Sequence, residues 1–280
     1  MIKTILVPRD AAEITRRVLA TGLALARQFD AHIELLLLRR DPDDAVPFVF
    51  GSLSSNKFRK TITDVIEHQE DDRAAEIRHR FDEFCQENAI PLVDGPTQPR
   101  QGVTASWREG EDETLLERSR LNDLILLQRP GEERRASMLE TVLLRAKRPI
   151  LMAPPEAQDT VGQHITIGWN GSAEASQAVS SAMPLLVRAE TVTILGSKRS
   201  QQSCETLQEY LAWHDINANL LLFERSGHNV GATLLEQAHS VQADLMVIGA
   251  YNRMRASQLL FGGVTQHLMR YADISVLMAH

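Results

Sequence analysis

The chain has 280 residues, of which 43% are hydrophobic and 24% charged, and its formal net charge is -7. This composition is typical of a folded globular protein with one large domain or two ordinary ones, and it excludes a disordered chain. The acidic balance argues against a nucleic-acid partner, and apolar runs such as residues 33–38 are too short to span a membrane.

In chain order, the first half is expected to alternate strands and helices. A strand begins almost at the N-terminus and leads through Pro8, Arg9 and Asp10 into an amphipathic helix over residues 12–29. Another helix is expected near residues 72–87. The longer stretch 41–71 before it is interpreted either as a lid over a pocket or as a mobile insertion. The expected strands are residues 3–7, 33–38, 91–93, 124–127 and 150–153.

The second half repeats this pattern. The clearest repeat is the sequence Thr-Leu-Leu-Glu, which precedes one expected strand at residues 114–117 and another at residues 233–236. Residues 154–159, with a proline pair and no apolar periodicity, are the expected linker. The sequence therefore predicts domains at 1–155 and 160–280, each an open, mostly parallel five-stranded sheet with helices on both faces. The expected strands here are residues 165–169, 191–195, 219–223, 244–248 and 276–279.

Two loops of the second half have the chemistry of an anion site. Ligands of open parallel sheets bind outside the carboxyl ends of the strands, where the strand order reverses. The first strand ends at Asn170-Gly171-Ser172, and the fourth leads to Gly249 and then to the pair Gly262-Gly263, which precedes a helix. Small residues and helix N-termini present backbone N–H groups to phosphate oxygens, so both loops predict a phosphorylated ligand.

With these loops the chain resembles a tandem universal stress protein of the UspA type, within the adenine-nucleotide alpha-hydrolase-like superfamily. Nucleotide-binding members carry Gly-x2-Gly-x9-Gly-(Ser/Thr) after the fourth strand, and this chain has Gly249-x2-Asn252-x9-Gly262-Gly263. The resemblance implies a Rossmann-like fold and a non-catalytic, stress-related binding or regulatory protein. It also implies ATP or AMP as the ligand of the second half, with Mg only if ATP is bound.

Three positions depart from the nucleotide-binding pattern. Asn252 replaces a glycine but is able to adopt the left-handed conformation, while Gly263 lacks a hydroxyl and Asn170 replaces an aspartate. Arg253 and Arg255 either grip phosphates or are simply solvated. Altered or weakened nucleotide binding is therefore expected. The implied site residues are Asn170, Gly171, Ser172, Gly249, Asn252, Arg253, Arg255, Gly262, Gly263, Val264 and Thr265.

The first half departs further from the pattern. Its loop after residue 127 keeps only Gly131, no glycine pair stands near Met138, and Ala11 and Ala12 replace the Gly-Ser cap. We therefore expect a degenerate domain that does not hold nucleotide in the family manner. The predicted contact between the halves is through residues 150–153 and 276–279, which makes an intramolecular pseudo-dimer, and further homodimerisation stays open.

Two other functions stay open. One is an enzyme of the wider superfamily that cleaves ATP, although no Ser-Gly-Gly-x-Asp-Ser run and no catalytic constellation is found. The other is a binder of another small ligand between the domains. His267 either faces the pocket or lies on a helix surface, and no histidine spacing indicates a metal. Two distant cysteines and no signal-peptide pattern predict free thiols and a cytoplasmic protein, with no nucleic-acid or membrane partner.

Overall fold

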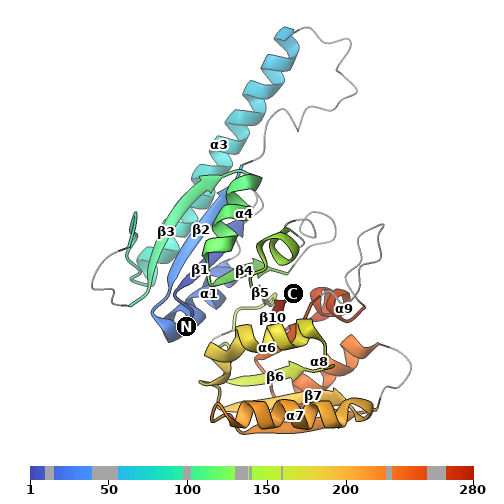
Figure 1. Ribbon diagram of the computed structural model, residues 1–280. Coiled ribbons are helices and arrows are strands. Elements are labelled where there is room, and N and C mark those ends of the chain that lie inside the picture. The colour runs from blue at the N-terminus through green and yellow to red at the C-terminus, as the bar shows by residue number, and fades with distance from the viewer. Residues whose placement is uncertain are drawn as a thin grey trace.

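A computed structural model describes residues 1–9, 16–39, 56–96, 102–129, 138, 141–158, 160–224, 229–250 and 263–280. These residues form one ten-stranded sheet with helices on both of its faces (Figure 1). The strand order is β3-β2-β1-β4-β5-β10-β9-β6-β7-β8, so each half of the chain contributes five adjacent strands.

The strands are β1 Thr4–Arg9, β2 His32–Leu38, β3 Thr104–Gly110, β4 Leu124–Gln128, β5 Ile150–Ala153, β6 His164–Gly168, β7 Thr191–Ser197, β8 Ala218–Phe223, β9 Leu245–Gly249 and β10 Ser275–Ala279. The helices are α1 Arg16–Phe29, α3 Asn56–Glu87, α4 Asp112–Leu121, α6 Ala173–Leu186, α7 Gln201–Ala212, α8 Val230–Ser240 and α9 Gly263–Tyr271. A π-helix spans Thr141–Ala146, and a 3-10 turn spans Lys198–Ser200.

The two halves share a continuous sheet because their last strands pair with each other. Within each half all neighbouring strands are parallel, whereas β5 and β10 are antiparallel, with Leu151 opposite Leu277. The expectation of two separate five-stranded sheets was therefore wrong. Each half alone would leave a row of unpaired backbone groups at its fifth strand, and the pairing of β5 with β10 satisfies both rows. These are the two segments that the sequence places at the contact between halves.

Two elements of the first half differ from expectation. The predicted strand at 91–93 forms only a single bridge, between Leu92 and Ala105, and the third strand is β3 instead. Polar side chains on β3 hide the strand from a search for apolar alternation. Helix α3 begins at Asn56, well before residue 72, and Figure 1 shows it extending past the end of the sheet. The part of the 41–71 stretch before residue 56 lies outside the described residues.

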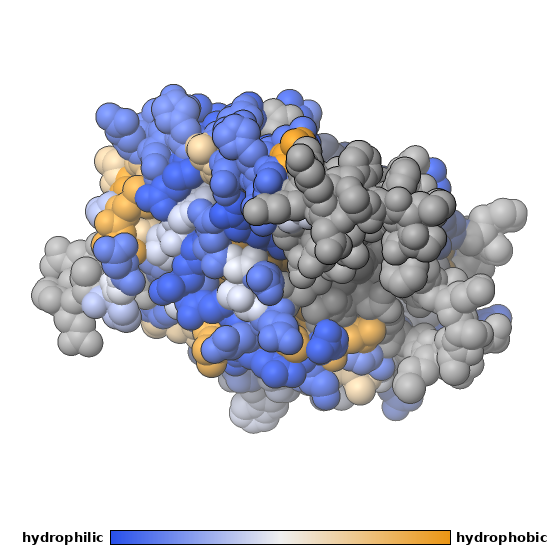
Figure 2. Space-filling model, turned by 90° about the horizontal axis from the view of Figure 1, so that it is seen from above, coloured by the Kyte–Doolittle hydropathy of each residue, from blue (hydrophilic) through white to orange (hydrophobic). Residues whose placement is uncertain are grey.

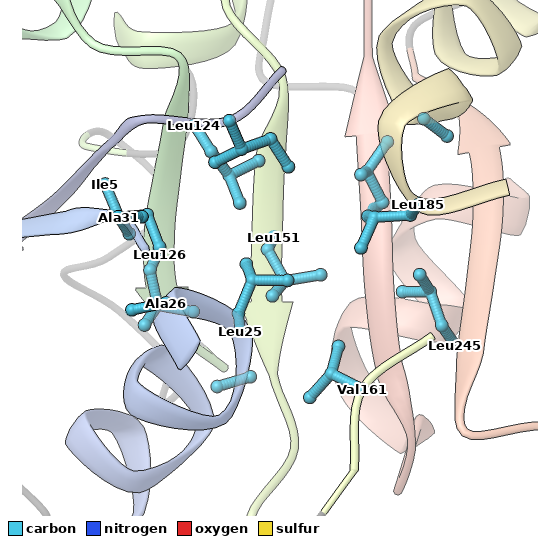
Figure 3. Packing of buried hydrophobic residues seen from close by; sticks show 14 of the residues in the cluster. Ile5, Leu25, Ala26, Ala31, Leu124, Leu126, Leu151, Val161, Leu185 and Leu245 are labelled. Atoms are coloured by element: carbon cyan, nitrogen blue, oxygen red, sulfur yellow. The ribbon is translucent and has the colours of Figure 1, made fainter. Parts of the chain in front are cut away.

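The core consists of two apolar clusters, one on each face of the sheet, and each contains residues of both halves. Helices α1, α3, α6 and α7 cover one face, while α4, the π-helix, α8 and α9 cover the other. Figure 3 shows Leu151 and Val161 between the side chains of the first half and Leu185 and Leu245 of the second. The apolar core therefore runs without interruption across the junction.

A repeated aspartate fixes the start of the central strands. The carboxylate of Asp123, just before β4, accepts hydrogen bonds from the backbone N–H groups of Lys3 and Thr4 at 2.7 and 3.1 Å. Asp244 holds the same place before β9 and accepts from the N–H groups of Gln163 and His164, both at 3.0 Å. Each half thus has an aspartate carboxylate that accepts hydrogen bonds from two backbone N–H groups where a strand begins.

The linker side of the junction is closed by hydrogen bonds from glutamines. The side chain of Gln158 donates to the Asp244 carbonyl and accepts from the Ser275 backbone and hydroxyl, at 2.7 to 3.2 Å. The Gln28 amide donates to the Val161 carbonyl at 2.7 Å. These bonds tie residues 158–161 to strands and helices of both halves, so the junction is ordered on its polar side as well.

The outer surface is mostly polar. Figure 2 shows a face on which hydrophilic side chains dominate and apolar ones form small, scattered patches. In the described ranges, no helix is both long and apolar enough to cross a membrane. Both cysteines, Cys85 and Cys204, are free and buried. Burial raises the pKa of the Cys85 thiol to about 12 and also raises that of Cys204, so neither is primed as a nucleophile.

Candidate functional site

The strand order places one reversal point in each half. In the second half it lies between β6 and β9, which pair in parallel from Ile165 opposite Leu245 to Gly168 opposite Ile248. Their carboxyl ends lead into the two loops that the sequence singles out. In the first half the corresponding neighbours are β1 and β4. Reversal points of open parallel sheets are where ligands bind, so the β6–β9 edge is the candidate site.

The loop after β6 is a tight turn that starts helix α6. The side chain of Asn170 accepts a hydrogen bond from the Ser172 backbone at 3.0 Å, and Gly171 has a φ of 74°. That left-handed conformation suits glycine, which has no Cβ. The Ser172 hydroxyl then caps α6 by accepting from the Ala175 N–H at 3.2 Å. The predicted turn and cap are confirmed, and the Asn170 oxygen is used within the turn.

Trp169 anchors this turn to the neighbouring helix. Its indole N–H lies 2.9 Å from the hydroxyl of Ser203 on α7 and 3.1 Å from the Ser203 carbonyl. A Cβ on Gly171 would lie 2.9 Å from the same hydroxyl. The turn is thus fixed from both sides. The sequence search did not select Trp169, although a half-buried tryptophan at a strand end needs a partner for its N–H.

Gly249 has a packing role that sequence reasoning missed. A Cβ at this position would lie 2.4 Å from the backbone nitrogen of Ala175 and 2.6 Å from the carbonyl carbon of Glu174. The first turn of α6 therefore rests directly on the end of β9. The sequence predicts that this small residue makes room for phosphate oxygens, but the adjacent space is filled by the α6 backbone. Gly249 brings the two loops together because it lets their backbones touch.

Helix α9 begins at Gly263, where a Cβ would have no heavy atom within 4 Å. Val264 is partly buried and Thr265 is 4% exposed, so Thr265 belongs to the packed face of α9. Asn252, Arg253, Arg255 and Gly262 lie outside the described residues. The described part of the site is therefore the turn after β6, the exit of β9 and the first turn of α9.

His267 pairs within the helix layer. Its Nδ1 lies 2.7 Å from the amide nitrogen of Asn229, whose oxygen caps α8 by accepting from the Gly231 N–H at 3.0 Å. Its ring also stacks near Tyr271, with centroids 4.6 Å apart. Of the two interpretations, the helix-surface one fits these contacts. Asn229 is thus both the N-cap of α8 and the partner of His267 on α9.

The electrostatics of the site depend on Glu174, which the sequence search also missed. Its pKa is lowered by hydrogen bonds from its own backbone N–H and from Ser172, and by the nearby His280. His280 itself lies against the exit of β9, with Nδ1 3.0 Å from the Ala250 carbonyl. A carboxylate therefore already occupies donors at the start of α6, where it complements the helix dipole. It repels any phosphate placed at the same helix end.

The reversal point of the first half is built differently. Arg9, at the position of Trp169, is 5% exposed and donates to the side chain of Gln128 at the end of β4, at 2.9 Å. Asp10 lies outside the described residues. No group of three or more His, Cys, Asp and Glu side chains is placed to hold a metal ion in the ranges that the structure describes.

The sequence of the C-terminal part identifies its family. Residues 198–280, from the turn before α7 to the end of β10, match the model of the universal stress protein family. Over these residues the chain is similar to a universal stress protein domain. The matched range includes β9, α9 and the loop between them, and the N-terminal half contains a second domain of similar fold.

Solved structures share this fold along the whole chain. A universal stress protein from Archaeoglobus fulgidus DSM 4304 is 11% identical, with a TM-score of 0.66, and the match covers 99% of this chain and 97% of that one. A putative universal stress protein from Pseudomonas aeruginosa UCBPP-PA14 is 16% identical, with a TM-score of 0.56 and coverage of 99% and 93%. A functionally unknown protein from Pseudomonas aeruginosa PAO1 is 17% identical, with a TM-score of 0.56 and coverage of 99% and 92%. Among curated proteins, none matches this sequence. At these identities, the likeness to the solved structures concerns the fold alone.

Proposed function

We propose that this protein is a non-catalytic binding or regulatory protein of the stress response, which binds adenine nucleotide weakly in its second half. The observation that carries the proposal is the meeting of two loops at the β6–β9 reversal point. There the turn at Asn170 and Ser172 lies against the exit of β9 at Gly249. The family match over residues 198–280 supports a stress-related role. The nucleotide class rests on the pattern Gly249-x2-Asn252-x9-Gly262-Gly263 in the sequence.

Three features of the site account for the weak binding that we propose. The Asn170 oxygen is used by the Ser172 N–H, so it is a poorer acceptor for a ribose or adenine edge. Glu174 keeps a negative charge at the start of α6, because its pKa is lowered there. Gly263 offers a backbone donor without the side-chain hydroxyl of the nucleotide-binding pattern. Each feature removes one attraction for part of the nucleotide or adds one repulsion of its phosphates.

The experiment is equilibrium dialysis with labelled ATP and AMP, beside native mass spectrometry of the purified protein. We expect binding in the millimolar range for the wild type. Gly263→Ser should tighten ATP binding about tenfold, since a hydroxyl bond to a charged phosphate contributes about 1.5 kcal/mol. The new side chain has room among the described residues, because none of their heavy atoms lies within 4 Å of the added Cβ. Gly263→Ala is the matched control, since it adds the same Cβ without the hydroxyl.

Two results would contradict the proposal. If neither the wild type nor Gly263→Ser binds nucleotide at millimolar ATP, the nucleotide-binding part of the proposal is wrong. Steady ATP cleavage that a single substitution at the β6–β9 edge abolishes would replace the binding role with the enzyme alternative. Phosphate release should therefore be measured in the same samples.

A groove between the halves favours a second candidate function, the binding of another small ligand. It has a volume of about 610 Å³ and lies between α1, the end of α3 and residues 157–163 and 188–190. Leu23 and Phe84 give it an apolar wall, and Arg188, which lies over the Phe29 ring at 4.6 Å, gives it a cation at the junction. This combination suits an amphipathic carboxylate. Saturable binding of decanoate that Arg188→Ala weakens would support it, and its absence would exclude it.

A further inference from the structure

A second pocket lies in the first half, at the end of the strands opposite to the one that the candidate site uses. It has a volume of about 190 Å³ and lies at the amino ends of β1, β2 and β3, on the face that α4 covers. Residues 93–96 close it at the edge of the sheet. The β6–β9 site uses the carboxyl ends of strands, so this pocket is a separate feature. Several polar side chains line it, on a sheet face that elsewhere carries leucines.

Three charged side chains meet in the wall of this pocket. Glu34 on β2 is 3% exposed, and Arg118 of α4 holds it with two bonds, one from Nε to Oε1 at 2.7 Å and one from Nη2 to Oε2. Arg108 on β3 brings its Nε to 3.5 Å from Oε2 of the same carboxylate. Two guanidinium groups thus share one carboxylate, and Arg108, whose side chain is 46% exposed, keeps further N–H donors beyond its Nε. Asp94 is exposed on the rim of the pocket, so the lining as a whole has two acidic and two basic side chains.

Next to these charges, His32 lies between two buried hydroxyl groups. Its Nδ1 is 2.9 Å from Thr104 Oγ1, and its Nε2 is 2.9 Å from Ser106 Oγ. A neutral imidazole has one donor and one acceptor nitrogen, so one of the two hydroxyls accepts from the ring. That hydroxyl keeps its own hydrogen to donate elsewhere. The pocket therefore combines the half-exposed guanidinium group of Arg108 with a buried hydroxyl donor.

The second half shows that the fold does not need these residues. The strand registers and the repeated Thr-Leu-Leu-Glu segment align Glu34 with Thr193, Arg108 with Leu221 and Arg118 with Gln237. The second half forms the same strands with one apolar and two uncharged residues there. Burying the Glu34 carboxylate in place of an uncharged side chain is costly unless something else requires it. Glu34, Arg108 and Arg118 therefore indicate a role other than folding, which the first half has and the second half lacks.

We propose that this pocket binds a small oxyanion, a phosphate or a short carboxylate, held by the Arg108 guanidinium and a hydroxyl of the Thr104–Ser106 pair. Guanidinium groups bind both anions through paired N–H donors. The volume of about 190 Å³ equals roughly six water molecules at about 30 Å³ each, which admits phosphate or a carboxylate of a few carbons and excludes a nucleotide. The half without the nucleotide loop thus carries a binding site of its own.

The test uses the full chain and follows the His32 ring signals by NMR during titration with sodium phosphate and, separately, with sodium acetate. Ionic strength is held constant with chloride. We expect a saturable shift of the His32 signals with at least one of the two anions. Arg108→Leu, which introduces the residue of the second half, should weaken binding at least about tenfold. Arg80→Leu removes a comparable charge from the outer face of α3 and should leave binding unchanged within about twofold.

A substitution of opposite sign makes the test sharper. Glu34→Gln removes the negative charge that competes with the ligand, so it should tighten anion binding about tenfold. Ser106→Ala tests the hydroxyl and serves as the second variant if Arg108→Leu does not fold. Saturation by phosphate alone or by acetate alone supports the site and identifies the anion. The proposal is overturned if neither anion gives a saturable His32 shift in the wild type, or if Arg108→Leu and Arg80→Leu weaken binding equally.

Discussion

The substitution of Gly249 by alanine tests the packing of the candidate site directly. A Cβ at this position would lie 2.4 Å from the Ala175 nitrogen and 2.6 Å from the Glu174 carbonyl carbon. Both contacts are with backbone atoms of α6, which cannot rotate away as a side-chain tip could. Normal carbon contacts need about 3.5 Å or more, so α6 must move by about 1 Å or β9 must bend. Either movement disturbs helix packing on the strand that borders the β6–β9 edge.

The magnitude follows from what such a shift does to a packed core. One extra methyl group forced into a closed interface costs about 1–3 kcal/mol, and we expect about 2 kcal/mol for Gly249→Ala, because the clash is with backbone. A chain of this size would then unfold about 4–8 °C lower. Gly263→Ala is the matched control, because its Cβ points into open space at the start of α9. It should be neutral or stabilising by up to about 0.5 kcal/mol, since alanine favours a helix over glycine.

The assay is urea and thermal unfolding of the wild type and both variants, followed by far-ultraviolet circular dichroism. The two variants make the same chemical change within one sequence motif, so a general effect of alanine would move both in the same direction. The reasoning fails if Gly249→Ala unfolds at the wild-type temperature, or if Gly263→Ala is destabilised as much as Gly249→Ala.

Three further predictions concern the duplicated fold and its charges. Asp244→Ala and Asp123→Ala each remove the acceptor for two backbone N–H groups. Each should lower the free energy of unfolding, measured by urea titration, by about 1–3 kcal/mol. An effect at only one of the two sites would contradict their equivalence. The lowered pKa of Glu174 means that its stabilising charge is present above the ordinary value of 4.5 and is lost as the pH falls through the lower value of the folded state. The melting-temperature gap between the wild type and Glu174→Gln should therefore narrow on acidification below about pH 4.5, and a constant gap would refute this. Residues 1–159 and 160–280, expressed as separate chains, should associate at micromolar concentration through β5 and β10; two monomers in analytical ultracentrifugation would disprove it.

Most of the fold was predictable because its signals are local. Runs such as Leu124–Leu127 and Leu245–Ile248 are apolar throughout, as strands covered on both faces must be. The cap at Asn229 and the turn at Gly171 follow from the backbone conformations that those residues favour. Strand β3 escaped prediction because Ser106 faces His32, and Arg108 shares the Glu34 carboxylate with Arg118, instead of facing a leucine core. Those partners come from β2 and α4, and no local pattern reveals them.

By itself, the sequence determined that this protein is a duplication of one α/β unit, which edge of the second unit carries glycine-rich loops, and which strands lie where the halves meet. Tertiary structure decided that β5 and β10 join the two units in one sheet, because each has an edge that the other completes. It also decided that Gly249 serves backbone contact with α6, and that Glu34, Arg108 and Arg118 share one pocket. Periodicity and turn chemistry act over a few residues and can be read along the chain, whereas these contacts join residues that only the fold brings together.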